Sequence, residues 1–249
     1  MHHLKKAFVY LMLIFVVAFK QGDEKIRLFM IGDSTMADKP LDENPERGWG
    51  RLLPLYLVPG MEVQNHAMNG RSTKSFLKEG RWDTVLSRLK KGDYVFIEFG
   101  HNDEKVDKPA VYAAANTDYR TNLIKFINEV RAKKAFPVLL TPVMRRKFDA
   151  NGIFQDTHGE YPDAVRKVAQ ELKVPLIDLH RKTETLLKNY GDEASKSLFL
   201  QIKEGENPNY PKGVTDNTHF NPKGAEEVAR LAVEEIRDKK LKLKKYLKK

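Results

Sequence analysis

An apolar segment near the start of the chain, residues 26–31, ends abruptly at Gly32-Asp33-Ser34. A short apolar run that is bounded by glycine is typical of a buried parallel strand. Such a strand presents the side chains that follow it at the rim of a sheet, which makes Ser34 a candidate nucleophile. Taken alone, the segment also fits a turn in which a serine or an aspartate caps a helix.

Further apolar segments alternate with segments of helical periodicity. Strands are predicted at residues 26–31, 62–67, 94–99, 136–140 and 174–179. Helices are predicted at residues 49–57, 75–90, 117–134, 161–172, 183–188 and 222–246, and loops at 38–50, 104–116, 144–160 and 201–218. This alternation implies right-handed crossovers and a parallel five-stranded sheet that is covered on both faces. No repeat or change of composition divides the body, so residues 23–249 are predicted to form a single α/β domain.

The composition supports a globular enzyme-sized domain. The 249 residues are 41% hydrophobic and 31% charged, which is enough for a full core. The chain has no cysteine. This excludes disulfides, thiolate metal sites, a cysteine nucleophile and a lipid anchor on an N-terminal cysteine. It does not exclude export, because a domain of this size needs no disulfides.

The net charge of +10 is confined to the two ends of the chain. Residues 1–20 hold three lysines and no acidic residue, and residues 239–249 hold seven lysines and no acidic residue. The body between them is neutral, so nucleic acid is not predicted as a partner. The C-terminal lysines are interpreted as the solvated end of the last helix, with contact to an anionic glycan or membrane surface, or disorder beyond Leu243, as the alternatives.

The N-terminus has the pattern of a signal peptide. Lys5 and Lys6 precede a nearly continuous apolar run at residues 7–19, which is too short to span a bilayer comfortably. We expect residues 1–22 to be a leader with cleavage near residues 18–22, or else an uncleaved anchor. Either form predicts that the body is exported, to the periplasm or the medium.

Two other candidate residues also follow predicted strands. Gly70 follows the second strand and Asn102 follows the third, as Ser34 follows the first. Because ligands of such sheets bind beyond the carboxyl ends of the strands, all three residues are expected along one edge. This shared placement favours a functional interpretation of Ser34 over a simple turn.

A serine hydroxyl needs a base and a stabilised oxyanion to act as a nucleophile. His219 is the candidate base, and Asp216, three residues earlier, is the candidate partner of its Nδ1–H. Backbone N–H groups of Ser34 and Gly70 and the side-chain amide of Asn102 are the candidate oxyanion donors. Each feature alone also fits an ordinary turn. No cluster has the spacing of metal ligands, and the chemistry needs no cofactor.

Four blocks in this order resemble those of the SGNH (GDSL-like) hydrolases. They are Gly32-Asp33-Ser34, Gly70, Gly100-His101-Asn102-Asp103 and Asp216-Asn217-Thr218-His219. The resemblance implies a flavodoxin-like three-layer α/β/α fold, Ser34 as nucleophile, Gly70 and Asn102 in the oxyanion hole, and Asp216 and His219 completing a triad.

Finer features are similar to one branch, the rhamnogalacturonan acetylesterases of bacterial type. They include Gly32-Asp-Ser-Thr-Met-Ala37, Gly48-Trp49-Gly50 and the segment 69–76. That branch removes acetyl groups from an acidic polysaccharide, which implies such a polymer as the partner. The alternatives are another esterase, lipase or thioesterase of the superfamily, or a non-catalytic glycan-binding module.

Cationic side chains near the edge of the sheet are candidates for binding a uronate substrate. They are Arg71 and Lys74 after the second strand and Arg145 and Arg146 after the fourth, and His158 in the 144–160 loop is added as a residue that lines the cleft. Each of them also fits solvated surface charge. The sequence does not indicate an oligomeric state.

Overall fold

The computed structural model describes residues 25–40 and 44–249. The expected leader, residues 1–22, lies outside the described residues. Within the described residues, no helix combines the length and the apolar character that crossing a membrane requires.

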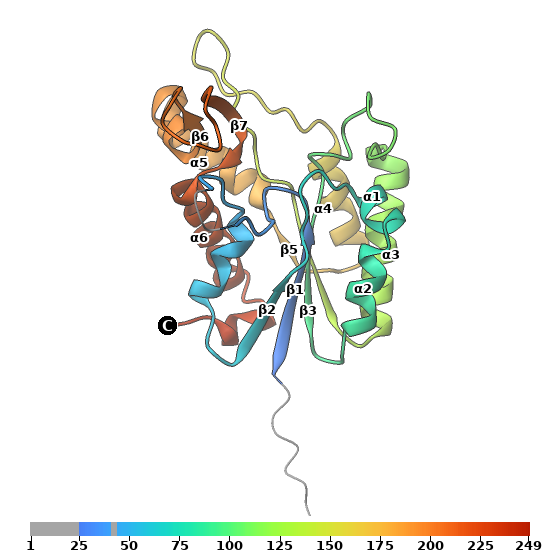
Figure 1. The fold of residues 1–249 in the computed structure, drawn as a ribbon. Coiled ribbons are helices and arrows are strands. Elements are labelled where there is room, and N and C mark those ends of the chain that lie inside the picture. The colour runs from blue at the N-terminus through green and yellow to red at the C-terminus, as the bar shows by residue number, and fades with distance from the viewer. Residues whose placement is uncertain (1–24, 41–43) are drawn as a thin grey trace, which may run out of the picture.

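A parallel sheet of five strands forms the centre of the molecule (Figure 1). Its strands, in the spatial order β2-β1-β3-β4-β5, are β2 (Met61–Asn65), β1 (Ile26–Gly32), β3 (Tyr94–Glu98), β4 (Phe136–Leu140) and β5 (Leu176–Ile177). The α-helices are α1 (Thr73–Lys78), α2 (Arg81–Arg88), α3 (Arg120–Ala132), α4 (Tyr161–Glu171), α5 (Leu179–Ser195) and α6 (Pro222–Asp238). The predicted three-layer α/β/α fold is confirmed.

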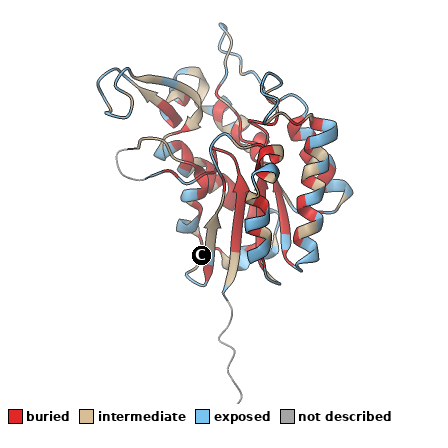
Figure 2. Ribbon diagram, turned by 45° about the vertical axis from the view of Figure 1, so that its right-hand side comes forward, coloured by how far each residue is buried: buried red, intermediate tan, exposed pale blue. Residues whose placement is uncertain are grey.

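Alternate side chains of β1 pack into two hydrophobic cores, one on each face of the sheet. Leu28 and Met30 pack on the side of α5 and α6, and Phe29 and Ile31 pack on the side of α1 to α4. All four are completely buried, as the period of two in a strand covered on both faces requires. Figure 2 shows this buried layer running through the sheet between the more exposed outer surfaces of the helices.

Several predicted helices have different bounds in the structure. The predicted helix 49–57 is two short 3₁₀ helices, Trp49–Arg51 and Leu53–Tyr56. The predicted helix 75–90 is two helices, because Gly80 takes a left-handed conformation (φ 67°) between α1 and α2. The predicted short helix 183–188 is part of the much longer α5, which contains a kink at Gly191.

The predicted loop 201–218 is wrong at both ends. β6 (Phe199–Ile202) and β7 (Val214–Phe220) form an antiparallel hairpin, which lies beyond the carboxyl ends of the main sheet in Figure 1. Glycine and proline correctly indicated the turn between these strands. β7 could not be recognised as a strand from the sequence, because its side chains are mostly polar and do not alternate with apolar ones.

The C-terminal lysines are not the end of a helix. α6 ends at Asp238, and the chain then folds back through a 3₁₀ turn (Lys242–Tyr246). Leu243 and Leu247 are buried in the core, and Leu247 pairs with Leu57 in an isolated bridge. The tail is therefore packed against the domain through its leucines, while its seven lysines are exposed.

Candidate active site

The turn after β1 places Ser34 at the carboxyl edge of the sheet. Gly32 permits this because a Cβ there would lie 2.6 Å from the carbonyl oxygen of Glu98. Asp33 fixes the turn, since its Oδ1 accepts hydrogen bonds from the Thr35 amide at 3.0 Å and from the Thr35 hydroxyl at 2.9 Å. Asp33 thus orients the nucleophile segment.

Ser34, His219 and Asp216 lie in a continuous hydrogen-bonded chain. His219 Nε2 is 2.8 Å from Ser34 Oγ, and His219 Nδ1 is 2.7 Å from Asp216 Oδ2. The other carboxylate oxygen of Asp216 accepts from the backbone amides of Thr218 and His219 at 2.7 and 2.9 Å. The predicted residues are therefore brought together, with a geometry that suits proton transfer from serine to histidine.

The electrostatics of this chain favour a charged aspartate and a basic histidine. Burial opposes ionisation of Asp216, but its hydrogen bonds with His219 and Thr218 outweigh burial and lower its pKa from 3.8 to about 2. Burial also opposes protonation of His219, but the hydrogen bond and the charge of Asp216 raise the pKa of His219 above 6.5. The side chain of His219 is 30% exposed, so the base can be reached from solvent.

Three candidate oxyanion donors lie in the segments that follow β1, β2 and β3. Among the described residues, the N–H groups of Ser34 and Gly70 have no hydrogen-bond acceptor. Gly70 has φ +74° and nothing within 4 Å of a hypothetical Cβ, so approach to its amide is open. One hydrogen of the Asn102 side-chain amide bonds the carbonyl oxygen of Arg71 at 3.0 Å. Its second hydrogen remains available for an oxyanion.

Several residues that support the site were not singled out from the sequence. Lys105 donates to the side-chain oxygen of Asn102 at 2.7 Å. Lys39 Nζ contacts the side chain of Asn69 and lies 2.7 Å from the carboxylate of Glu46. The same carboxylate of Glu46 is 4.0 Å from His219 Nε2. Spacing in the sequence gave no signal for these contacts, because the residues come from segments predicted as loops.

Buried ionisable groups lie beneath the nucleophile turn. His101 Nδ1 is 3.3 Å from Asp33, and burial lowers the pKa of His101 to about 4. Burial and the charge of Asp33 raise the pKa of Glu98 well above 4.5, and Trp49 Nε1 donates to Glu98 at 2.7 Å. His101 is therefore a neutral, buried residue at neutral pH.

The predicted substrate-binding residues differ in accessibility. Arg71 pairs with Glu79 at 3.0 Å and Lys74 donates to a backbone carbonyl at 2.9 Å, and both lie near Gly70 and the surface. Arg145 is partly buried and paired with Glu104.

Arg146 and His158 are not placed for binding a substrate. Arg146 is buried and bonded to Asp192, Ser195 and Asn217. His158 is buried, with its ring nitrogens at 3.0 Å from Glu104 and 2.8 Å from the Val143 carbonyl oxygen. The guanidinium of Arg146 and the ring nitrogens of His158, which were predicted to bind substrate, are therefore bonded to other residues of the domain.

Groups of three or more His, Asp or Glu residues suited to a metal ion are absent from the part of the chain that the structure describes. The arrangement of Ser34, His219 and the three donors can carry out acyl transfer from an ester to water through a covalent intermediate.

Comparison with known structures supports the architecture. The crystal structure of protein YxiM from Bacillus subtilis superposes with a TM-score of 0.75 at 27% identity, over 88% of this chain and 58% of that chain. Axe2, an acetylxylan esterase from Geobacillus stearothermophilus, superposes with a TM-score of 0.62 at 18% identity, over 85% of this chain and 94% of that chain.

Comparison with known sequences supports the predicted resemblance. Rhamnogalacturonan acetylesterase RhgT of Bacillus subtilis is 46% identical over 89% of this chain and 94% of its own length. A second Bacillus subtilis protein, the probable rhamnogalacturonan acetylesterase YesY, is 35% identical over 85% of this chain and 92% of its own length. The GDSL-like Lipase/Acylhydrolase family model matches residues 30–227. The chain therefore belongs to the GDSL-like lipase/acylhydrolase family and is an esterase.

Proposed function

We propose that this protein removes acetyl groups from rhamnogalacturonan, the acidic polysaccharide of pectin. The observation that carries the proposal is the 46% identity to RhgT over nearly the whole of both chains. It is strengthened by the blocks around Ser34, Gly70 and Asn102, which meet at one edge of the sheet.

In the proposed reaction, Ser34 Oγ attacks the acetyl carbonyl carbon while His219 Nε2 takes the hydroxyl proton. The carbonyl oxygen becomes an oxyanion, which the N–H groups of Ser34 and Gly70 and the amide of Asn102 stabilise. Collapse of this intermediate breaks the bond to the sugar oxygen, which receives the proton from His219. The product of this half-reaction is a free sugar hydroxyl and an acetylated Ser34.

The second half-reaction regenerates the enzyme. His219 takes a proton from water as the water oxygen attacks the acetyl-enzyme. Acetate leaves, and the proton returns from His219 to Ser34 Oγ. Asp216 stays ionised throughout, because it holds the imidazole and stabilises its protonated form.

The test is hydrolysis of three esters, measured as release of acetate from acetylated rhamnogalacturonan and from acetylxylan and as release of fatty acid from a long-chain acyl ester. We expect a preference for the first substrate and loss of release in Ser34→Ala. A preference for acetylxylan or for the long-chain ester would reassign the substrate, and undiminished release by Ser34→Ala would remove Ser34 from the mechanism.

We further propose that the protein is exported, because Lys5 and Lys6 precede the apolar run at residues 7–19. Export would bring the enzyme to a polymer too large to enter a cell. Fractionation of the producing cells, with the N-terminus of the mature protein determined, tests this. Full-length protein that remains in the cytoplasm would contradict it.

A further inference from the structure

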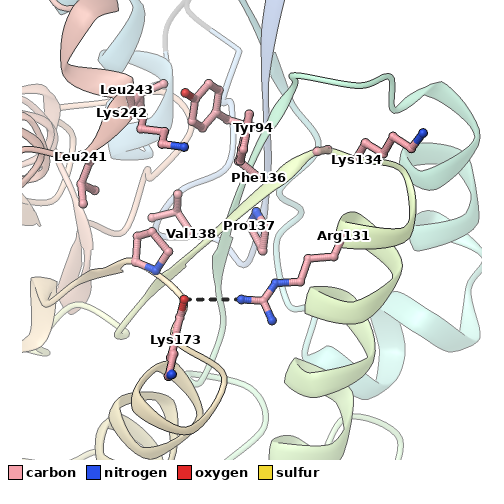
Figure 3. A pocket seen from close by; sticks show the side chains of 12 residues that line it. Tyr94, Arg131, Lys134, Phe136, Pro137, Val138, Lys173, Leu241, Lys242 and Leu243 are labelled. Atoms are coloured by element: carbon pink, nitrogen blue, oxygen red, sulfur yellow. Dashed lines mark hydrogen bonds between the residues drawn. The ribbon is translucent and has the colours of Figure 1, made fainter.

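A cavity of about 540 Å³ lies at the amino edge of the sheet, opposite the edge that carries Ser34 (Figure 3). Tyr94 and Phe136, the first residues of β3 and β4, line it, and their rings are 5.1 Å apart. Leu241 and Leu243 of the folded-back tail face them. A strand of five residues separates this cavity from the catalytic edge by roughly 15 Å.

The cavity carries positive charge only. Its basic lining residues are Arg131, Lys134, Lys173 and Lys242, and none of the described acidic residues lines it. The Arg131 guanidinium donates to the carbonyl oxygens of Leu172 and Lys173, which closes one wall. Lys242 Nζ lies 5.4 Å from the centre of the Phe136 ring. The site thus combines an aromatic and aliphatic surface with Arg131 and Lys242, which point toward it, while the side chains of Lys134 and Lys173 extend outward from its rim (Figure 3).

The backbone at two of these lysines has an unusual conformation. In the described residues, the non-glycine positions with positive φ are Lys134, Lys173 and Lys240, at 57°, 49° and 51°. They directly follow the C-caps of α3, α4 and α6. Glycine is the usual residue at this position because it takes the left-handed conformation without steric cost. Lysine complements the helix dipole there, but it does so at the expense of backbone strain.

We propose that this cavity is a second binding site, for a carboxylate-bearing sugar unit of an acidic polysaccharide. The exposed ring of Phe136, with the largely buried Tyr94 beside it, suits the apolar face of a sugar ring, and the lysines at the rim of the cavity suit its carboxylate. The inference rests on the proposed function for the class of ligand. The site would hold the polymer on the enzyme while a distant acetyl group is removed at Ser34.

A polysaccharide fits this surface better than a membrane does. Phe136, at 39% exposure, is the one member of the cavity among the exposed large hydrophobic residues of the described chain. Insertion into a bilayer needs protruding apolar side chains, whereas this surface is recessed. A recess with cations around apolar walls is the usual form of a site for a small anionic group.

The first experiment measures binding of de-esterified polygalacturonate, which carries no acetyl group, to the full chain. The variant combines Lys134→Gln, Lys173→Gln and Lys242→Gln. Its control combines Lys125→Gln, Lys167→Gln and Lys188→Gln, which remove the same charge from exposed positions on α3, α4 and α5. We expect roughly tenfold weaker binding for the cavity variant and little change for the control, since charge-assisted contacts dominate such recognition. Turnover of a small neutral acetyl ester should be unchanged in both.

A second variant separates binding from stability. Lys134→Gly with Lys173→Gly relieves the left-handed backbone, so the melting temperature should stay the same or rise while binding weakens. Equal weakening in the control, no binding by the unmodified protein, or capture by anionic phospholipid vesicles in place of polygalacturonate would each overturn the proposal. Binding of polygalacturonate without deacetylation of rhamnogalacturonan would instead refute the proposed function and leave the second site standing.

Discussion

The side-chain amide of Asn102 donates a hydrogen bond of 3.0 Å to the backbone carbonyl oxygen of Arg71. This bond ties the segment after β3 to the segment that contains Gly70, so two candidate oxyanion donors keep a fixed relative position. Lys105 completes the arrangement, because its ammonium group donates to the other end of the same amide at 2.7 Å. An ammonium group cannot accept a hydrogen bond, so Lys105 also determines which end of the amide faces the site.

Asn102→Ala removes one oxyanion donor without creating a large cavity. We expect kcat to fall about a hundredfold or more, which corresponds to roughly 3 kcal/mol of transition-state stabilisation. Circular dichroism and thermal unfolding should remain close to those of the unmodified protein. Unchanged turnover in a folded variant would exclude Asn102 from the oxyanion hole.

Lys105→Met tests the positioning of that donor. We expect kcat to fall by about tenfold, less than in Asn102→Ala, because the amide is still present but is free to turn. KM for a small neutral ester should change little. The matched control is Lys108→Met, which removes an exposed lysine three residues further along. Equal effects of the two substitutions would indicate a general influence of charge.

The pH dependence of the reaction follows from His219. Only neutral His219 can accept the serine proton, and the pKa of His219 is raised above 6.5. The value of kcat/KM should therefore fall as the pH is lowered through a pKa above 6.5. Asp216 keeps its charge over this range, since its pKa is lowered to about 2.

Asp216→Asn removes the charge, and because the backbone amides of Thr218 and His219 hold the remaining oxygen, an N–H donor faces the imidazole in place of an acceptor. Activity should fall by about 10⁴-fold, and the remaining activity should lose its dependence on a raised histidine pKa. The acid limb of the pH profile therefore moves to lower pH. Measurement of kcat/KM between pH 5 and 9 tests both expectations, and an unmoved acid limb would show that another group sets the profile.

The strands of the sheet and the Asp216–His219 pair could be predicted because each rests on a local pattern, whereas the contact of His219 with the distant Ser34 was expected from the resemblance to the SGNH hydrolases. Apolar strands that end at Gly32 or Gly100 are visible in the sequence, and the spacing of Asp216 and His219 is that of one short segment. The order of these blocks also matches the family that the comparisons show. Local patterns of this kind determine strand ends and nearby hydrogen bonds.

The β6–β7 hairpin and the buried position of Arg146 could not be predicted in this way. β7 forms its backbone hydrogen bonds with β6 across a long turn, and the side chains of β7 are mostly polar. Arg146 looks like surface charge because the sequence does not show that Asp192 and Asn217 lie beside it. Both features depend on pairing between distant segments, which periodicity does not report.

Arg146→Gln should act through this structural role. Arg146 joins the 191–195 part of α5 to Asn217, next to Asp216 of the candidate triad. We expect a lower melting temperature and similar losses of kcat on a small acetyl ester and on the polymer, because a buried charged network loses a partner. Arg71→Gln, at the surface, should instead raise KM for the acidic polymer alone. If Arg146→Gln raised only KM for the polymer and Arg71→Gln lowered kcat on both substrates, Arg146 would be a substrate contact after all.

The carboxyl group of Asp103 is protonated in the folded protein at neutral pH. Burial raises its pKa from 3.8 to about 8, although Thr73 donates to its Oδ1 through both its amide and its hydroxyl. A carboxyl group whose pKa is raised by folding favours the unfolded state as the pH increases, because only the unfolded chain releases the proton. Between about pH 4 and 8, this group should lower the free energy of unfolding by about 1.4 kcal/mol per pH unit.

Asp103→Asn should remove this dependence. The asparagine oxygen can accept both hydrogen bonds from Thr73, and the amide stays neutral at every pH. The variant should therefore lose less stability than the unmodified protein as the pH rises from 5 to 8 in denaturant unfolding. Asp103→Leu, which cannot accept from Thr73, is the control and should be unstable at every pH. A slope in Asp103→Asn equal to that of the unmodified protein would show that Asp103 is already ionised in the folded state and that another buried group sets the slope.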